Sequence, residues 1–290
     1  MSHNAPLYPN IQAEVEFYNR YFSIQPEHCL NIGMEGIPRE VPFDIYVITF
    51  NNPFLVEYQI KTLRRFFQPD FNLIIVDNNN WLHPESSKEI YNICLREGVL
   101  YLKAPDNYYQ RPESFDPSMK LGTTMNWLFH NVIKGRRLKY FGVLDHDCFL
   151  FRDIDLRPYL NEKNMYGTVC RTSKSDAWNL HVTANFFRFD FVKDLPLDFR
   201  ASHKHTLDTG GANYELLYRD RNINDYVLDH HGHRYANHDV NRKDSVQHYE
   251  IIDNCWFHMA ASSHDQLAGD GAYKLIYAKG FLDSRLLLHR

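Results

Sequence analysis

The sequence predicts an α/β protein with a mixed, mainly parallel sheet and helices on both faces. Apolar segments of strand length recur between residues 43 and 151, and segments of helical period separate them. That alternation is typical of parallel sheets covered by helices on both sides. Polar clusters also follow the ends of three of these strands, where ligands bind in such sheets.

Composition limits the classes of protein that need to be considered. The chain has 290 residues, 44% of them hydrophobic, enough for one large core. With 32 basic and 36 acidic residues and no basic block, it has no electrostatic signature of a nucleic-acid-binding protein. The first residues do not resemble a signal peptide, and no apolar run is long enough to span a membrane, which leaves peripheral membrane association open. Five scattered cysteines favour reduced thiols, so we expect a cytoplasmic protein.

The helices and strands of the first half follow from hydrophobic periodicity. Val56, Ile60 and Leu63 form an apolar stripe at helical spacing behind Pro53, a residue suited to the first turn, and Asn52 is a suitable N-cap. The expected elements are a helix at 11–22, strands at 43–50, 71–76 and 99–102, helices at 53–67, 86–97 and 121–133, and a polar loop at 104–118.

Two carboxylates, Asp145 and Asp147, flank His146 at the end of an apolar strand that begins near Tyr140. If the backbone stays extended, side chains two residues apart point the same way, and both carboxylates converge on one point. Two such oxygen ligands suit Mg²⁺ or Mn²⁺, with substrate phosphates completing the shell. The alternative is a turn in which the Asp side chains accept hydrogen bonds from backbone amides.

The three polar clusters are predicted to share one crevice. They are 49–52, 77–80 and 145–147, each at the carboxyl end of a predicted strand. The chain has neither the glycine pattern of dinucleotide-binding proteins nor that of a P-loop. A bound phosphate would therefore be held by a metal ion and by side chains.

The ordered set of motifs resembles the nucleotide-sugar glycosyltransferases of the GT-A fold, particularly those of family 2. It consists of Ile45–Asn51, Leu73–Asn78, a helix containing Asn126, and Leu144–Asp147. The resemblance implies a nucleotide-sugar donor, a Mn²⁺ or Mg²⁺ ion at the Asp-x-Asp motif, and transfer of a sugar to a hydroxyl of a glycan or other acceptor.

The resemblance also implies roles for individual residues. Thr49 and Asn51 would meet the nucleoside, and Asp77 would read the base, typically the uracil of a UDP-sugar. Asn126 and Asp145 would belong to the donor site, with Asp145 near the ribose and metal. Asp147 would be the direct metal ligand. The chain departs from many relatives in carrying Asn78-Asn79-Asn80 where they have Gly-Ser or similar.

The second half carries fewer signals. We expect a strand at 180–189 and a helix after Gly210-Gly211, which Asp208 or Thr209 could cap. Relatives usually have an acidic residue near the acceptor in this part of the chain, so Asp208 and Glu215 are the candidates for a catalytic base. The histidine-rich run at 229–234 lacks a helical ligand frame, and we interpret it as a surface loop rather than a metal site.

His258 ends the last predicted strand, at 250–258. Its position matches the late histidine that completes the metal shell in many GT-A enzymes, and the alternative is a core histidine behind Trp256. The last residues form a strand or a helix that could serve as a lid, an oligomer contact or an acceptor surface.

These predictions divide the chain into one domain with two extensions. An arm at 1–41 precedes a glycosyltransferase domain at 42–265, and an extension follows at 266–290. Within the domain, 42–155 would bind the nucleotide-sugar and 156–265 the acceptor. The alternative functions are a sugar nucleotidyltransferase, whose usual glycine-rich loop is missing here, and a non-enzymatic nucleotide- or carbohydrate-binding module, which would not hydrolyse a donor.

Overall fold

A computed structural model describes residues 20–79, 83–106, 116–234, 248–259 and 270–288. Its strands are β1 (Asn31–Ile32), β2 (Phe43–Thr49), β3 (Phe71–Asp77), β4 (Leu100–Lys103), β5 (Tyr140–Asp145), β6 (Cys148–Leu150), β7 (Met165–Arg171), β8 (Trp178–Arg188), β9 (His230–Arg234), β10 (His248–Ile252) and β11 (Trp256–His258). Its α-helices are α2 (Pro53–Phe66), α3 (Pro84–Glu97), α4 (Pro117–Leu128), α5 (Lys134–Arg136), α6 (Arg157–Lys163), α7 (Phe189–Val192) and α9 (Asp270–Leu287). Short 3₁₀ segments are η1 (Pro26–His28), η5 (Gly211–Asn213) and η7 (Ile223–Asp225), and π segments are η4 (Phe129–Ile133) and η6 (Tyr214–Tyr218).

The main sheet has seven strands in the order β1-β4-β3-β2-β5-β8-β7. Strands β4, β3, β2 and β5 are parallel. Strands β1 and β8 run antiparallel to them, and β7 runs antiparallel to β8, so β7 points the same way as the parallel four. The predicted mixed, mainly parallel sheet is therefore confirmed, and the carboxyl ends of β2, β3 and β5 share one edge.

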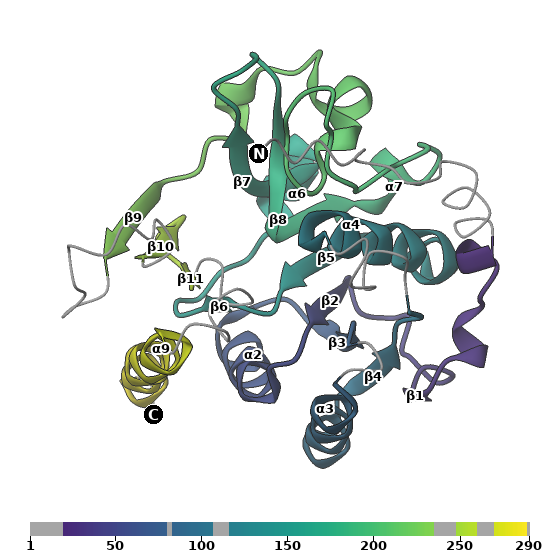
Figure 1. Ribbon diagram of the computed structural model, residues 1–290, viewed down its shortest axis with the longest axis vertical. Helices are drawn as coiled ribbons and strands as arrows, with labels where there is room; N and C mark the ends of the chain where they lie inside the picture. Colours follow the sequence, from purple (N-terminus) through teal and green to yellow (C-terminus); the bar gives the residue numbers. More distant parts are fainter. Residues whose placement is uncertain (1–19, 80–82, 107–115, 235–247, 260–269, 289–290) are drawn as a thin grey trace, which may run out of the picture.

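Helices cover both faces of this sheet, as predicted (Figure 1). On β2, Phe43, Ile45 and Val47 pack in the same cluster as the apolar stripe of α2 and the buried residues of α3. The alternate residues Tyr46 and Ile48 pack in a second cluster with α4. Because β2 is buried on both sides, its sequence is apolar almost throughout instead of alternating with polar residues.

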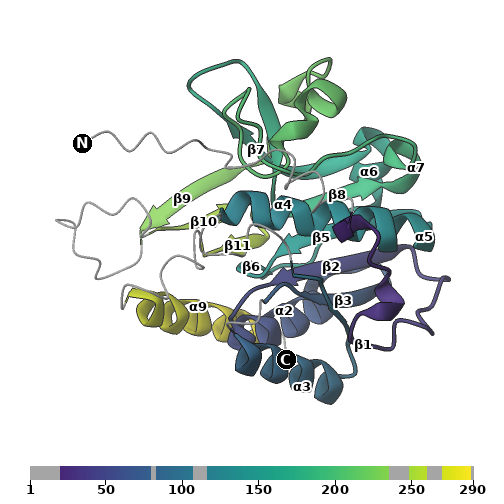
Figure 2. The same cartoon turned by 45° about the vertical axis from the view of Figure 1, so that its right-hand side comes forward.

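A second, antiparallel sheet has the order β6-β11-β10-β9. Helix α9 packs beside it and alongside α2 (Figure 2). The prediction of one continuous strand at 250–258 is wrong, because Asp253 and Asn254 have φ of 51° and 53° and reverse the chain into a hairpin. Asp and Asn tolerate this left-handed conformation better than most residues.

Three further predictions for the second half need correction or refinement. Residues 230–234 form β9, not a surface loop, because they pair with β10 over its full length. Neither Asp208 nor Thr209 caps a helix: Gly210, with φ of 89°, precedes a 3₁₀ turn and then a π turn. The C-terminal segment is a helix, one of the two predicted alternatives.

The N-terminal segment lies against the main sheet where the structure describes it. Strand β1 pairs with β4 at the sheet edge, and the Trp127 indole donates a 2.8 Å hydrogen bond to the Ile24 carbonyl. The helix predicted at 11–22 falls almost entirely outside the described residues. None of the helices that the structure describes has the length and apolar character needed to cross a membrane.

Candidate active site

The Asp-x-Asp motif is a turn and not an extended strand. Strand β5 ends at Asp145, and His146 and Asp147 turn the chain into β6 of the second sheet. The carboxylate of Asp145 accepts a 2.8 Å hydrogen bond from the His146 backbone amide, so the turn alternative describes Asp145 correctly. The two carboxylates still interact, since burial and then the charge of Asp147 raise the pKa of Asp145.

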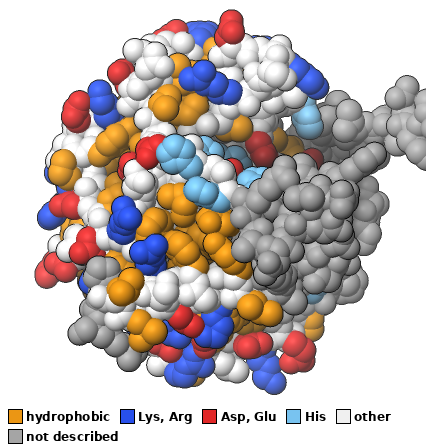
Figure 3. Space-filling model, turned by 90° about the vertical axis from the view of Figure 1, so that its left-hand side faces the viewer, with side chains coloured by type: hydrophobic (Ala, Val, Ile, Leu, Met, Phe, Trp, Pro, Cys, Tyr) orange, Lys and Arg blue, Asp and Glu red, His pale blue; other side chains and the backbone are white. Residues whose placement is uncertain are grey.

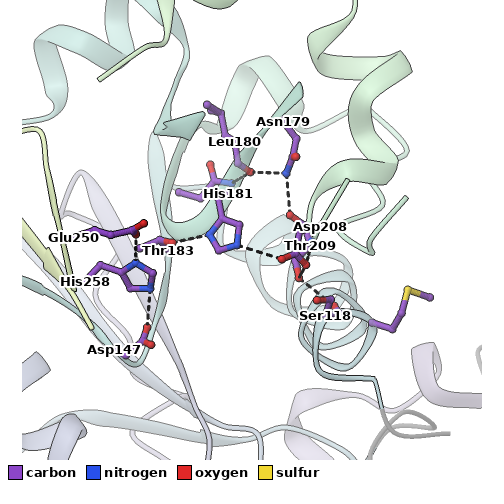
Figure 4. Close-up of polar contacts among 12 residues, drawn as sticks. Ser118, Asp147, Asn179, Leu180, His181, Thr183, Asp208, Thr209, Glu250 and His258 are labelled. Atoms are coloured by element: carbon purple, nitrogen blue, oxygen red, sulfur yellow. Dashed lines mark hydrogen bonds and ion pairs between the residues drawn. The ribbon is translucent and has the colours of Figure 1, made fainter. Parts of the chain in front are cut away.

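Asp147 faces His258, the last residue of β11. His258 Nε2 lies 3.4 Å from Asp147 Oδ1, and His258 Nδ1 lies 2.7 Å from Oε2 of Glu250 on β10 (Figure 4). Burial alone would lower the pKa of His258, but the two carboxylates outweigh it and raise the pKa to about 10. The proximity predicted for His258 and Asp147 is present in the structure.

This arrangement fits a divalent cation. Two ligands of one ion, each about 2.1 Å from it, lie about 3.0–3.4 Å apart, the spacing of Asp147 Oδ1 and His258 Nε2. A ligating histidine commonly gives its other ring N–H to a carboxylate, as Nδ1 faces Glu250. Among the described residues, no group of three or more His, Cys, Asp or Glu side chains is arranged to hold a metal ion. Mg²⁺ and related ions often take only one or two protein ligands and complete their shell with substrate phosphates and water.

At the ends of β2 and β3, Asp77 is enclosed by its own neighbours. Its carboxylate accepts hydrogen bonds from the Asn79 amide at 2.9 Å and the Tyr101 hydroxyl at 2.8 Å, and lies 3.6 Å from Lys103 Nζ. Its side chain has no exposed surface. The predicted base-reading carboxylate therefore also fixes the backbone after β3.

Two polar atoms near Asp77 lack hydrogen bonds in the described chain: Thr49 Oγ1 and Asn79 Nδ2, both buried. The side-chain oxygen of Asn79 instead accepts from the backbone amide of Asn51. Buried polar groups are normally satisfied, and an exception can mark a ligand site. Thr49 thus ends β2 and Asn51 follows it, next to Asn79, a residue that the sequence analysis did not assign to the site.

Lys120 is a second addition at this edge. Its ammonium lies 3.1 Å from the centre of the Phe50 ring, and its side chain is 4% exposed. Burial, and then the charge of Lys103, lowers the pKa of Lys120 to about 7. The prediction missed it because the helix was expected to begin at 121. The spacing could have indicated its burial. Lys120 lies one helical turn before Thr124 and two turns before Leu128, on the same buried face of α4.

Asn126 connects α4 to the chain after α7. Its Nδ2 donates to Asp198 at 2.8 Å, and its Oδ1 accepts from the Phe199 amide at 2.7 Å. Both ends of its amide are thus used inside the protein.

Asp208 pairs with a histidine of β8. His181 Nε2 lies 3.6 Å from Asp208 Oδ2, and His181 Nδ1 lies 2.6 Å from the Thr183 hydroxyl (Figure 4). Burial raises the pKa of Asp208, but hydrogen bonds led by that from His181 bring it well below its usual range. Burial, and then the charges of Asp208 and Glu250, raise the pKa of the Cys170 thiol.

Glu215, the other predicted carboxylate, has different surroundings. It pairs with Lys204 at 2.9 Å, His205 at 3.1 Å and Arg219 at 2.8 Å. Two cations, Lys204 and Arg219, and one histidine thus share this carboxylate, whose side chain is 43% exposed.

Comparisons with known proteins add a likeness of fold. No protein-family model matches the sequence, and no curated protein matches it. The chain is similar to the mannosyltransferase PcManGT from Pyrobaculum calidifontis, solved with GDP-Man and Mn²⁺: 12% identity over 65% of this chain and 55% of that one, TM-score 0.37. It is also similar to TarS 1-349 from S. aureus, solved with UDP-GlcNAc: 12% identity over 57% of this chain and 50% of that one, TM-score 0.36. The chain spans about half the length of these two structures.

Proposed function

We propose that the protein is a metal-dependent glycosyltransferase that moves a sugar from a nucleotide-sugar, preferably a UDP-sugar, to a hydroxyl of a glycan or other acceptor. The observation that carries the proposal is the pair Asp147–His258, backed by Glu250, beside the carboxyl ends of parallel strands. Ligands of α/β sheets bind at that edge. The motif resemblance described above supports the same activity.

Asp147 and His258 are the residues that would hold Mn²⁺ or Mg²⁺, with Asp145 beside them. The ion would neutralise the diphosphate so that it can leave as the nucleotide. The imidazole ligand favours Mn²⁺ over the harder Mg²⁺. Asp147 reaches this position because His146 and Asp147 turn the chain away from β5.

The nucleoside would bind over the ends of β2 and β3. Thr49 Oγ1 and Asn79 Nδ2 supply a hydroxyl and an amide without other hydrogen bonds in the described chain, and Lys120 supplies a cation at the same edge. We propose that Asp77 accepts the uracil imide in place of one of its present partners, with the Asn51 amide donating to the Asn79 side chain. Asn126 would shape the wall of the donor site through its bonds to residues 198 and 199.

For the proton of the acceptor hydroxyl, we propose Asp208 over Glu215. The side chain of Asp208 is 46% exposed, so an acceptor can reach it, although His181 pairs with Oδ2 and Thr209 donates to Oδ1. Both carboxylate oxygens of Glu215 are already engaged, Oε1 by Lys204 and His205 and Oε2 by Arg219, so neither is open to an acceptor hydroxyl.

Two other functions compete. A sugar nucleotidyltransferase would consume a nucleoside triphosphate and a sugar phosphate, and a binding module would leave the donor intact. A screen of nucleotide-sugars by thermal shift, with and without Mn²⁺, followed by detection of released nucleotide, separates a transferase from both. Binding to the folded state raises the melting temperature by mass action. Stabilisation by a UDP-sugar plus Mn²⁺, with slow UDP release, is the expected result; stabilisation without any turnover across acceptors would contradict a transferase.

A further inference from the structure

Glu250 is the hub of a histidine cluster that extends beyond the proposed metal ligands. Its Oε2 contacts His258 Nδ1 at 2.7 Å, and its Oε1 lies 3.3 Å from His230 Nε2 and 3.6 Å from His248 Nε2. Figure 3 shows histidine side chains gathered beside acidic ones on this side of the molecule, above a patch of apolar surface. One carboxylate thus connects histidines of three strands.

The strand register brings these residues together. Glu250 is directly opposite His258 in the β10–β11 hairpin, and His230 is opposite Ile252 on β9. Cross-strand partners project from the same face of a sheet, as do residues two apart on one strand. His230, His248, Glu250 and His258 therefore share one face.

We propose that Glu250 is a positioning residue for His258, and that His230 and His248 hold the Glu250 carboxylate in turn. This inference rests on the cation of the proposed function. Glu250 would act through His258 without touching the cation.

The physical argument concerns which ring nitrogen is available. A neutral imidazole carries one N–H and one lone pair, and the group bonded to one nitrogen decides the state of the other. When Nδ1–H donates to Glu250, the lone pair is on Nε2, the atom 3.4 Å from Asp147 Oδ1. Without the carboxylate, the ring can adopt the other tautomer or rotate. Loss of such an outer partner typically weakens metal binding by about 10–100-fold.

Direct Mn²⁺ titration of the full chain, followed by electron paramagnetic resonance at one pH, tests the inference without an acceptor. Glu250→Gln keeps the size and an acceptor oxygen, whereas Glu250→Ala removes both. We expect both variants to bind Mn²⁺ more weakly than wild type. The loss of affinity should be larger in Glu250→Ala and should fall within about 10–100-fold. His230→Ala should produce a smaller loss, because His248 still contacts Oε1.

His231→Ala is the matched control. His231 is adjacent to His230 but projects from the opposite face of β9 and pairs with Asp229 at 2.6 Å. It should leave Mn²⁺ affinity unchanged. Equal affinity in wild type and both Glu250 variants, with unchanged melting temperatures, would overturn the positioning role while leaving the proposed metal site standing. A wild-type chain that binds no Mn²⁺ would overturn both.

Discussion

The backbone amide of Phe50 donates a 3.0 Å hydrogen bond to Nδ1 of His146, which joins the end of β2 to the turn after β5. The middle residue of the Asp-His-Asp motif thus has a structural role, because it bonds the turn to the end of β2. By holding the turn against β2, it helps to direct Asp147 toward β11. Because Nδ1 accepts, the ring proton of neutral His146 is on Nε2.

Replacing His146 should therefore affect both stability and metal binding. In His146→Leu the Phe50 amide loses its acceptor, which should cost about 1–3 kcal/mol in the free energy of unfolding. His146→Asn can offer its side-chain oxygen near the Nδ1 position and should recover part of the loss. Urea titration measures the stability, and Mn²⁺ titration reports whether Asp147 has moved. Wild-type stability in His146→Leu would mean that water replaces the imidazole.

The proposed ligands can be tested by removing each in turn. Asp147→Asn keeps the shape of the side chain and removes its charge, and His258→Ala removes the nitrogen ligand. Both should weaken Mn²⁺ activation of nucleotide release, and EDTA should abolish release until Mn²⁺ is restored. His258→Ala should lose more of its Mn²⁺ activation than of its Mg²⁺ activation, because imidazole is the poorer ligand for Mg²⁺. Full turnover in chelator would contradict metal dependence.

Lys120 predicts an unusual dependence of stability on pH. Its pKa is about 7 in the folded chain and about 10.4 when unfolded. Between these values the unfolded chain binds more protons than the folded chain, so the free energy of unfolding rises with pH. Below pH 7 the full cost of burying the charged Lys120 side chain is present. Lys120→Met should remove a cost of order 4 kcal/mol at neutral pH and below.

The measurement is the difference in unfolding free energy between wild type and Lys120→Met across this pH range. Taking this difference cancels the contributions of other titrating groups. We expect the difference to shrink as the pH rises. If Lys120 also meets the diphosphate, the same variant should bind UDP more weakly than wild type. Parallel stability curves would show that Lys120 keeps its proton through contacts with its neighbours.

Base recognition separates Asp77 from Asn79. If Asp77 accepts the uracil imide, Asp77→Asn should reduce the preference for UDP over ADP and CDP, since a mispaired polar group is strongly penalised. If Asp77 only holds Asn79, Tyr101 and Lys103, the variant should lower the melting temperature with the preference intact. Asn79→Ala then becomes the informative variant. Calorimetry with the three nucleotides gives the preference.

The catalytic base can be assigned by a paired comparison. Asp208→Asn should lower kcat about 10²–10⁴-fold with UDP affinity nearly unchanged. Glu215→Gln should change kcat far less, because both oxygens of that carboxylate are already engaged by Lys204, His205 and Arg219. The reverse order of effects would assign the role to Glu215. Circular dichroism melts control for unfolding.

Sequence patterns predicted the parallel core well because local periodicity determines it. The buried strands β2, β3 and β5 are apolar almost throughout, and the apolar stripe of α2 has helical spacing. Proximity of His258 to Asp147 was expected from the family resemblance. Glu250 was missed for a physical reason: in a single extended strand, Glu250 and His258 would lie about 26 Å apart. The hairpin makes them direct neighbours, and no glycine or proline marks its turn.

The turn at Asp253 and Asn254 therefore determines which side chains of β10 and β11 lie opposite each other. Adding or deleting one residue there would shift the β10–β11 pairing by one position and send Glu250 to the opposite face of the sheet. His258 would then lose its carboxylate partner although every functional side chain was still encoded. The length of this turn is thus as necessary to the site as the identity of its side chains. A chain with an altered turn could keep its fold and still lose metal binding.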